Sequence, residues 1–199
     1  MTACNNSSRQ EKNNDNASVN PLLHESTLPY TTPDFSKIKN EDYRPAMLEG
    51  IQLKKEAISK IANNPAAPTF ENTLVALEKS GESLDRALAP FYALTGAHTN
   101  DTLQQLQEEI APLLSDVHDF IYLNDSLFHR IQSLYDKQNE LNLDKESLKL
   151  LDNYYTDFKI AGAALSTESK EQLKKMNARL ATLTAQFNKT MLAANNSGA

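Results

Sequence analysis

The chain has 199 residues, 40% of them hydrophobic, and a formal net charge of −6. Its length is that of one domain or of one large part of a bigger domain. Nucleic-acid binding needs clustered Lys and Arg, but the one basic run, residues 174–179, shares its segment with Glu168 and Glu171, so we expect no nucleic-acid partner. No apolar run approaches the roughly 18 residues of a membrane span, and the single cysteine excludes an internal disulfide framework and a four-cysteine zinc site.

Residues 1–20 are expected to form a disordered tether, because a segment rich in Asn, Ser and charge cannot offset the entropy of ordering. Thr2-Ala3-Cys4 is similar to the end of a bacterial lipoprotein signal, with Met1 in place of the apolar region. We therefore expect lipidation of Cys4, a membrane tether, and a periplasmic or membrane-anchored location. The alternative is a cytoplasmic protein in which Cys4 occurs by chance.

The segment after the tether contains Pro21, Pro29 and Pro33, which disfavour a long helix and favour extended backbone. Its apolar side chains are expected to pack along the domain surface as an ordered strap, and they are Leu22, Leu23, Leu28, Tyr30 and Phe35.

From residue 40 onward the apolar spacing is helical, and residues 21–199 are interpreted as one helical region. Capping residues divide it into helices. The expected caps are Asn40, Thr69, Asn124 with Asp125, Asp144 and Ser166, with an end at Asn63-Asn64-Pro65 and a break at Ser80-Gly81.

The middle of the chain carries a clear amphipathic pattern. Six apolar residues spaced 3, 4, 3, 4 and 4 lie on one face of a helix, namely Leu103, Leu106, Ile110, Leu113, Val117 and Ile121. Pro112 lies inside this stretch and removes one hydrogen bond, which predicts a kink or a break between two shorter helices.

The last predicted helix runs from Ser166 to about Ala194. Its apolar series has the same spacing and is expected to be buried, and it consists of Leu173, Met176, Leu180, Leu183, Phe187 and Met191. We expect this helix to form a long helical hairpin with residues 144–165. Since alternating β-branched runs with hairpin turns are absent from the sequence, the predicted fold class is all-α.

His24-Glu25 begins like the helical motif of zinc peptidases, in which a second His follows one turn later. Position 28 is Leu, and Pro29 rules out the helix that would aim the ligands. The sequence therefore predicts no zinc site here.

Asp125 and His129, one helical turn apart, could supply two metal ligands, but no third or fourth is evident. A surface hydrogen bond or charge pair is the alternative. His98 is interpreted as a loop residue and His118 as a helix-face residue. We predict no catalytic residue and no metal ligand in this chain.

Several short segments nevertheless occur in an order that is characteristic of one protein family. They are Asn20-Pro21-Leu22-Leu23, Leu28-Pro29-Tyr30, Asp42-Tyr43-Arg44-Pro45-Ala46, Pro68-Thr69-Phe70-Glu71-Asn72-Thr73, Ala76-Leu77-Glu78, Ala97-His98-Thr99-Asn100-Asp101, Ile121-Tyr122-Leu123-Asn124, Phe158, Ala161-Gly162-Ala163 and Leu183-Thr184-Ala185-Gln186-Phe187-Asn188. Together they resemble the N-terminal region of bacterial peptidyl-dipeptidases, members of the thimet-oligopeptidase family of zinc metallopeptidases. The resemblance covers about residues 20–199.

The resemblance implies a larger enzyme with two mostly helical halves around a deep channel, one wall of which this chain would form. It also implies that the full-length parent holds zinc through a His-Glu-x-x-His motif and a later Glu, and releases dipeptides from the C-terminus of short peptides by activating a zinc-bound water. The chain stops at Ala199 without such a motif, so no catalytic or metal residue of the family maps onto it.

We therefore expect a part of a larger peptidase that is inactive alone and binds no zinc itself. Its expected partners are the C-terminal catalytic half and, through the whole protein, short peptides. Apolar surface left uncovered without that half would favour self-association. The alternative hypothesis is a stand-alone helical lipoprotein that binds peptides or a partner protein without cleavage.

Overall fold

The computed structural model describes residues 20–198, and this part of the chain folds into helices without a strand, which confirms the all-α prediction. The α-helices are α1 (Asn40–Ala62), α2 (Ala76–Lys79), α3 (Glu82–Ala97), α4 (Asp101–Tyr122), α5 (Asp125–Asp136), α6 (Lys145–Ala161) and α7 (Thr167–Ser197). Short helical turns are η1 (Pro21–Leu23), η2 (Pro29–Thr31), the π-turn η3 (Glu71–Val75) and η4 (Gln138–Glu140). None of the helices in residues 20–198 has the length and apolar character needed to cross a bilayer.

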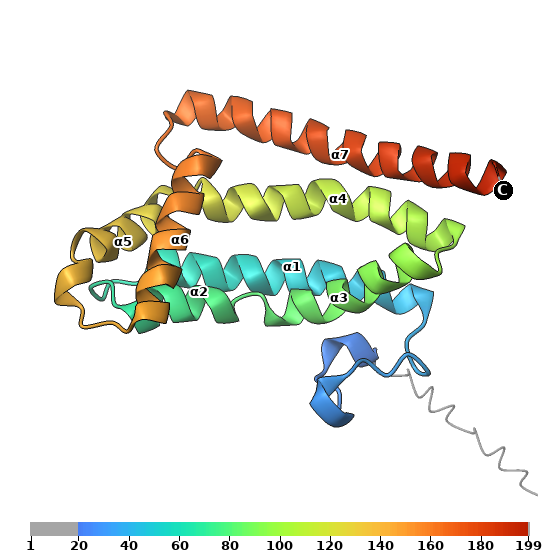
Figure 1. Cartoon of the computed structure of the whole chain (residues 1–199), viewed down its shortest axis with the longest axis horizontal. Coiled ribbons are helices and arrows are strands. Elements are labelled where there is room, and N and C mark those ends of the chain that lie inside the picture. The colour runs from blue at the N-terminus through green and yellow to red at the C-terminus, as the bar shows by residue number, and fades with distance from the viewer. Residues whose placement is uncertain (1–19, 199) are drawn as a thin grey trace, which may run out of the picture.

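The helices lie in layers, with α4 between α7 on one side and the pair α1 and α3 on the other (Figure 1). The buried core sits mainly between these elements and under α5 and α6, and its largest fully buried side chains include Tyr43, Met47, Phe91, Ile110 and Phe158. At Gly50, α1 and α3 approach so closely that a Cβ atom would lie 2.7 Å from the Cα atom of Leu84.

Most of the predicted helix starts are confirmed by their capping hydrogen bonds. The side chain of Asn124 accepts from the Leu127 N–H at 2.9 Å, that of Asp144 from Ser147 at 2.8 Å, and that of Ser166 from Ser169 at 3.3 Å. The prediction for Asn40 is wrong, because α1 already includes Asn40. There the Asp42 carboxylate accepts from the Lys39 N–H at 2.8 Å instead.

The loop between α1 and η3 is held by a buried arginine on α5. Arg130, 7% exposed, donates through Nη1 to the carbonyl oxygens of Asn64 at 2.9 Å and Ala66 at 3.1 Å, and through Nη2 to Asn72 Oδ1 at 2.8 Å. Asn72 and Thr69 also cap each other, each side chain accepting from the other's N–H. The predicted cap at Thr69 is thus confirmed. Its partner in this cap, Asn72, is connected to α5 through the Arg130 guanidinium.

Of the kink or break predicted at Pro112, the break does not occur, since α4 runs without interruption from Asp101 to Tyr122. One missing N–H removes one hydrogen bond, whereas the flanking turns are held by contacts to α1 and α7. The predicted buried face is confirmed except at Leu113, which is 37% exposed. Leu114 packs against the core instead.

The partner of the last helix differs from the prediction. The long helix α7 packs along α4, while α6 packs on α5 and stands across the end of the layers (Figure 1). The face that meets α4 carries mainly small and polar residues together with the half-buried Leu192, and Ala185 and Lys170 are buried. Apart from the half-buried Leu173, the apolar series was therefore wrongly expected to be buried, because heptad spacing identifies an apolar face but does not choose its partner.

The N-terminal strap is only partly confirmed. Leu22 is buried and Leu23 packs beside it, and Arg86 donates to the Leu23 carbonyl oxygen at 3.4 Å. Tyr30 is 99% exposed, because Tyr30 and Thr31 have φ angles of 58° and 53° and turn the chain outward. Two further expected strap residues, Leu28 and Phe35, are also exposed.

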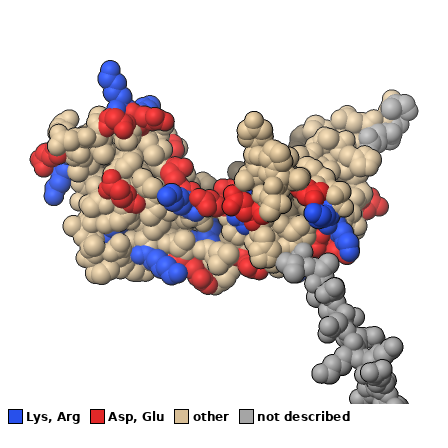
Figure 2. Space-filling view, turned by 90° about the horizontal axis from the view of Figure 1, so that it is seen from below, with Lys and Arg blue, Asp and Glu red and all other residues tan. Residues whose placement is uncertain are grey.

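Acidic and basic side chains lie interspersed over the face of the molecule that Figure 2 shows.

Candidate functional site

The residues considered as metal ligands do not come together. His24 is exposed beside α3, and His129 is exposed on α5. Asp125 forms an ion pair with the buried Lys170 of α7 rather than facing a second ligand. Among residues 20–198 there is no group of three or more His, Cys, Asp or Glu arranged to hold a metal ion, so this part of the chain does not fit zinc. The predicted lipidation residue, Cys4, lies outside the described residues.

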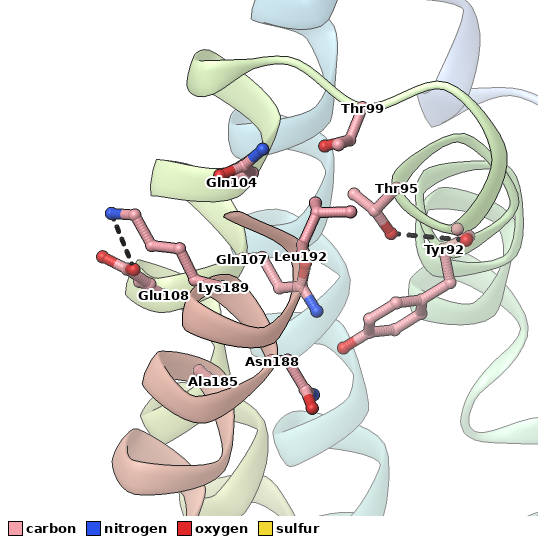
Figure 3. Close-up of a pocket in the computed structure, with 11 residues that line it drawn as sticks. Tyr92, Thr95, Thr99, Gln104, Gln107, Glu108, Ala185, Asn188, Lys189 and Leu192 are labelled. Carbon is pink, nitrogen blue, oxygen red and sulfur yellow. Dashed lines mark hydrogen bonds and ion pairs between the residues drawn. The ribbon is translucent and has the colours of Figure 1, made fainter. Parts of the chain in front are cut away.

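A single pocket of about 570 Å³ lies between the N-terminal segment and α3. A second hollow lies between α4 and α7, with α3 at one end. It consists of two adjoining pockets of about 320 and 480 Å³ that share Tyr92, Gln107, Ala185 and Asn188. Figure 3 shows the first pocket, with side chains converging from all three helices. We call the two pockets together the α4–α7 groove.

The surface that lines the α4–α7 groove is mostly apolar and carries several neutral polar side chains. The side-chain amides of Gln104, Gln107 and Asn188 make no hydrogen bond with any other described residue, although all three line the groove. The hydroxyl of Thr99 is enclosed and has no hydrogen-bond partner within residues 20–198. Burial raises the pKa of Tyr92, whose phenol therefore keeps its proton at neutral pH and remains a donor.

Few charges reach the groove. Lys189 of α7 and Glu108 of α4 form an ion pair at 2.9 Å on its rim (Figure 3). At the other end, Asn177 donates to the buried Asp119 carboxylate at 2.7 Å, which fixes α7 on α4. His118 lines the second pocket, on the face of α4 as predicted, and stacks on Tyr122 with ring centroids 4.5 Å apart.

The polar groups of the groove can donate and accept hydrogen bonds. A carboxamide with no internal partner both donates and accepts hydrogen bonds, as the main chain of an extended peptide does. Within the described lining no nucleophile has a base in hydrogen-bond contact. The sequence did not reveal the groove, because its residues come from three helices whose pairing no local pattern encodes. The nearest sequence signal is the pair Gln104 and Gln107, one turn apart beside an apolar face.

No family profile matches the chain. It is, however, similar to curated proteins. It is 47% identical over 180 residues to dipeptidyl carboxypeptidase of Escherichia coli (strain K12), covering 90% of this chain and 26% of that protein. It is 48% identical over 181 residues to dipeptidyl carboxypeptidase of Salmonella typhimurium, covering 91% and 27%. Oligopeptidase A of Escherichia coli (strain K12) is 27% identical over 174 residues, covering 87% and 25%.

The described chain is thus all-α and homologous to these peptidases, in agreement with the resemblance to the thimet-oligopeptidase family that the ordered segments indicated. Within that family its sequence is more similar to the two dipeptidyl carboxypeptidases than to oligopeptidase A. The chain spans about a quarter of the length of these curated relatives.

Proposed function

We propose that this chain is the helical N-terminal portion of a zinc-dependent peptidyl-dipeptidase and forms one wall of the channel that receives short peptides. The whole enzyme would release dipeptides from the free C-terminus of its substrate. The observation that carries the proposal is the 47% identity over 180 residues to a dipeptidyl carboxypeptidase. Zinc, when bound elsewhere in such an enzyme, supplies the activated water.

This chain's own contribution would be to hold the substrate. In the α4–α7 groove, Gln104, Gln107 and Asn188 offer amides with no internal partner on two facing helices. Hydrogen bonds from these amides to a peptide main chain would not depend on the substrate's side chains. The Tyr92 phenol adds a donor at the end of the groove.

A chimeric enzyme tests the proposal. The 180 aligned residues of the Escherichia coli dipeptidyl carboxypeptidase are replaced by the matching residues of this chain, and dipeptide release from a short peptide is measured. We expect an active enzyme. A folded, zinc-loaded chimera without activity would refute the proposal. If the chain alone then bound a labelled peptide, the alternative of a stand-alone binding protein would replace it.

Substitutions in the groove test the role of the amides. In the active chimera, Gln107→Leu and Asn188→Leu should each raise KM with little effect on kcat, by roughly fivefold for a lost net hydrogen bond of about 1 kcal/mol. Gln105→Leu is the matched control, because Gln105 is exposed on the same helix and does not line the groove. Equal kinetics in all three variants would mean that the groove does not hold the substrate.

We also propose that Cys4 carries a lipid that tethers the protein to a membrane on the periplasmic side. The support is the sequence Thr2-Ala3-Cys4 followed by a polar segment. In cells of the source organism, we expect the protein in the membrane fraction, released by detergent and not by high salt. A Cys4→Ser allele should move it to the soluble fraction. An identical distribution of both alleles would contradict the lipid anchor.

A further inference from the structure

A row of large apolar side chains runs along the outer side of α7. Met176 is 60% exposed, Leu180 64%, Leu183 43%, Phe187 66% and Met191 49%. We call these five residues the α7 stripe. Isolated exposed apolar residues are common on protein surfaces, but a continuous row of this kind is a recurrent mark of an interaction surface.

The spacing of the α7 stripe defines the shape of its partner. Intervals of 4, 3, 4 and 4 residues keep the side chains on one side of the helix over about 22 Å. This is the pattern with which one amphipathic helix packs along another. The opposite side of α7 holds α4 through Ala185, which is buried, and Ala181. Helix α7 can therefore accept a second helix without leaving the first.

The sign of the charged residues beside the α7 stripe indicates which charged residues a partner would carry. From Gln172 onward the chain has four basic residues and no acidic one. Lys174 is paired with Glu171, and Lys189 with Glu108. Arg179 makes no ion pair or hydrogen bond with any described residue, and the neighbouring Lys175 has only Glu171, which Lys174 already binds. Both basic residues are exposed and lie one turn apart along one edge of the stripe.

These observations distinguish between two occupants. A second copy of the chain, packed with its α7 against this α7, would bring basic residues and, after Glu171, no carboxylate to the interface between the two helices. The basic residues of the two copies would therefore repel each other. A helix with Glu or Asp beside its apolar face would instead place carboxylates against Lys175 and Arg179.

We infer that the α7 stripe is the docking site for an amphipathic helix with acidic residues beside its apolar face. The inference rests on the proposed function, since the remainder of the peptidase polypeptide supplies this helix, and most of each dipeptidyl carboxypeptidase relative lies outside the aligned region. Leu180 belongs both to the stripe and to the lining of the α4–α7 groove. The docked helix therefore borders the α4–α7 groove at Leu180.

Thiol protection tests the inference on the full chain. Leu183→Cys is introduced together with Cys4→Ser, and the rate of labelling by a soluble thiol reagent is measured at residue 183 by peptide mass spectrometry. Two synthetic helices with the same Leu face, one flanked by Glu and one by Lys, are the probes. We expect the Glu-flanked peptide to slow labelling about tenfold when present at ten times its Kd, and the Lys-flanked peptide to require a much higher concentration.

Two variants make the test specific. Lys175→Glu with Arg179→Glu should reverse the preference in favour of the Lys-flanked peptide. Ile160→Cys is the matched control, because Ile160 is an apolar residue of α6 that is 80% exposed, and neither peptide should protect it. Equal protection by both peptides, or protection at residue 160 as well, would overturn the inference. So would protection that rises with the chain's own concentration in the absence of peptide, because the occupant would then be a second copy.

The source of the helix is tested in the chimeric enzyme described above. Leu183→Cys should label far more slowly in the chimera than in the chain alone. A catalytically active chimera in which residue 183 labels as fast as in the chain alone would overturn this inference and leave the proposed function intact. An inactive chimera would instead refute the proposed function, while the peptide experiment would still decide the chemistry of the stripe.

Discussion

Replacing Arg130 by Ala should destabilise the protein by about 3 kcal/mol, since each hydrogen bond from a charged donor contributes roughly 1.5–3 kcal/mol. The sum over the guanidinium's three bonds, to Asn64, Ala66 and Asn72, is an upper bound. Ala66 is exposed, so its carbonyl would be rehydrated once the arginine is gone. The Nε of Arg130 is buried without a partner in the described structure, which lowers the net contribution further.

Urea unfolding followed by circular dichroism measures this effect. Arg130→Ala should lower the midpoint with little change in slope, because the loss is one of stability and not of compactness. Arg130→Lys should recover only part of the loss, since one ammonium cannot reach three divergent acceptors. Arg179→Ala is the control and should stay within about 0.5 kcal/mol, as exposed residues without partners do. A cost below about 1 kcal/mol for Arg130→Ala would show that the loop is held by other contacts.

Three further outcomes are expected. Gly50→Ala should lower the unfolding free energy by about 1–3 kcal/mol, because the added Cβ would meet the Leu84 backbone. Gly96→Ala should raise it by up to about 1 kcal/mol, because the space around Gly96 in α3 is open. Equal effects of the two variants in urea unfolding would contradict the close approach. The hydrogen bond from Arg44 lowers the pKa of Glu109. The pair therefore stabilises the fold above the ordinary carboxyl pKa of about 4.3, and this stabilisation is lost as the pH falls through the lowered pKa. Glu109→Gln should reduce the acid-induced loss of unfolding free energy, measured by unfolding at several pH values. Burial and the hydrogen bond to Glu78 raise the pKa of Tyr154, so its stabilising effect is complete below about pH 10 and is lost above it, and in an ultraviolet titration Tyr154→Phe should remove the phenol that ionises last.

Local signals explain how much of the fold could be predicted. Asn124, Asp144 and Ser166 cap helices as expected because an N-cap depends only on the next three residues. The buried face of α4 was also predictable, apart from Leu113. These features need no knowledge of which helices are neighbours.

Pairing between helices could not be predicted in the same way. The apolar series of α7 indicated a buried face, yet Leu180 and Phe187 are exposed and Ala185 meets α4. Small residues that allow close approach carry little hydrophobic signal, so periodicity favoured the wrong side of the helix. The groove was hidden for the same reason, since Gln107 and Asn188 lie 81 positions apart and become neighbours only through this pairing. The homology to dipeptidyl carboxypeptidases, in contrast, was accessible from ordered segments alone.

The contacts that hold α7 on the rest of the protein make its first turns locally more stable than its last turns. Near its start, the buried Lys170 donates to the Leu123 carbonyl at 3.2 Å and binds Asp125, and Asn177 follows with its bond to Asp119. Farther along, α7 is held by the buried Ala185, the half-buried Leu192 and the partly exposed ion pair of Lys189 with Glu108, and among the described residues no side-chain hydrogen bond to α4 follows Asn177 apart from that pair. Backbone amide exchange should therefore be slowest in the first turns and become faster toward the C-terminal end, as the helix opens from that end. Asn188 lies in the part that opens first, so the width of the groove would fluctuate with local unfolding of α7 and be steadied by whatever covers its outer side.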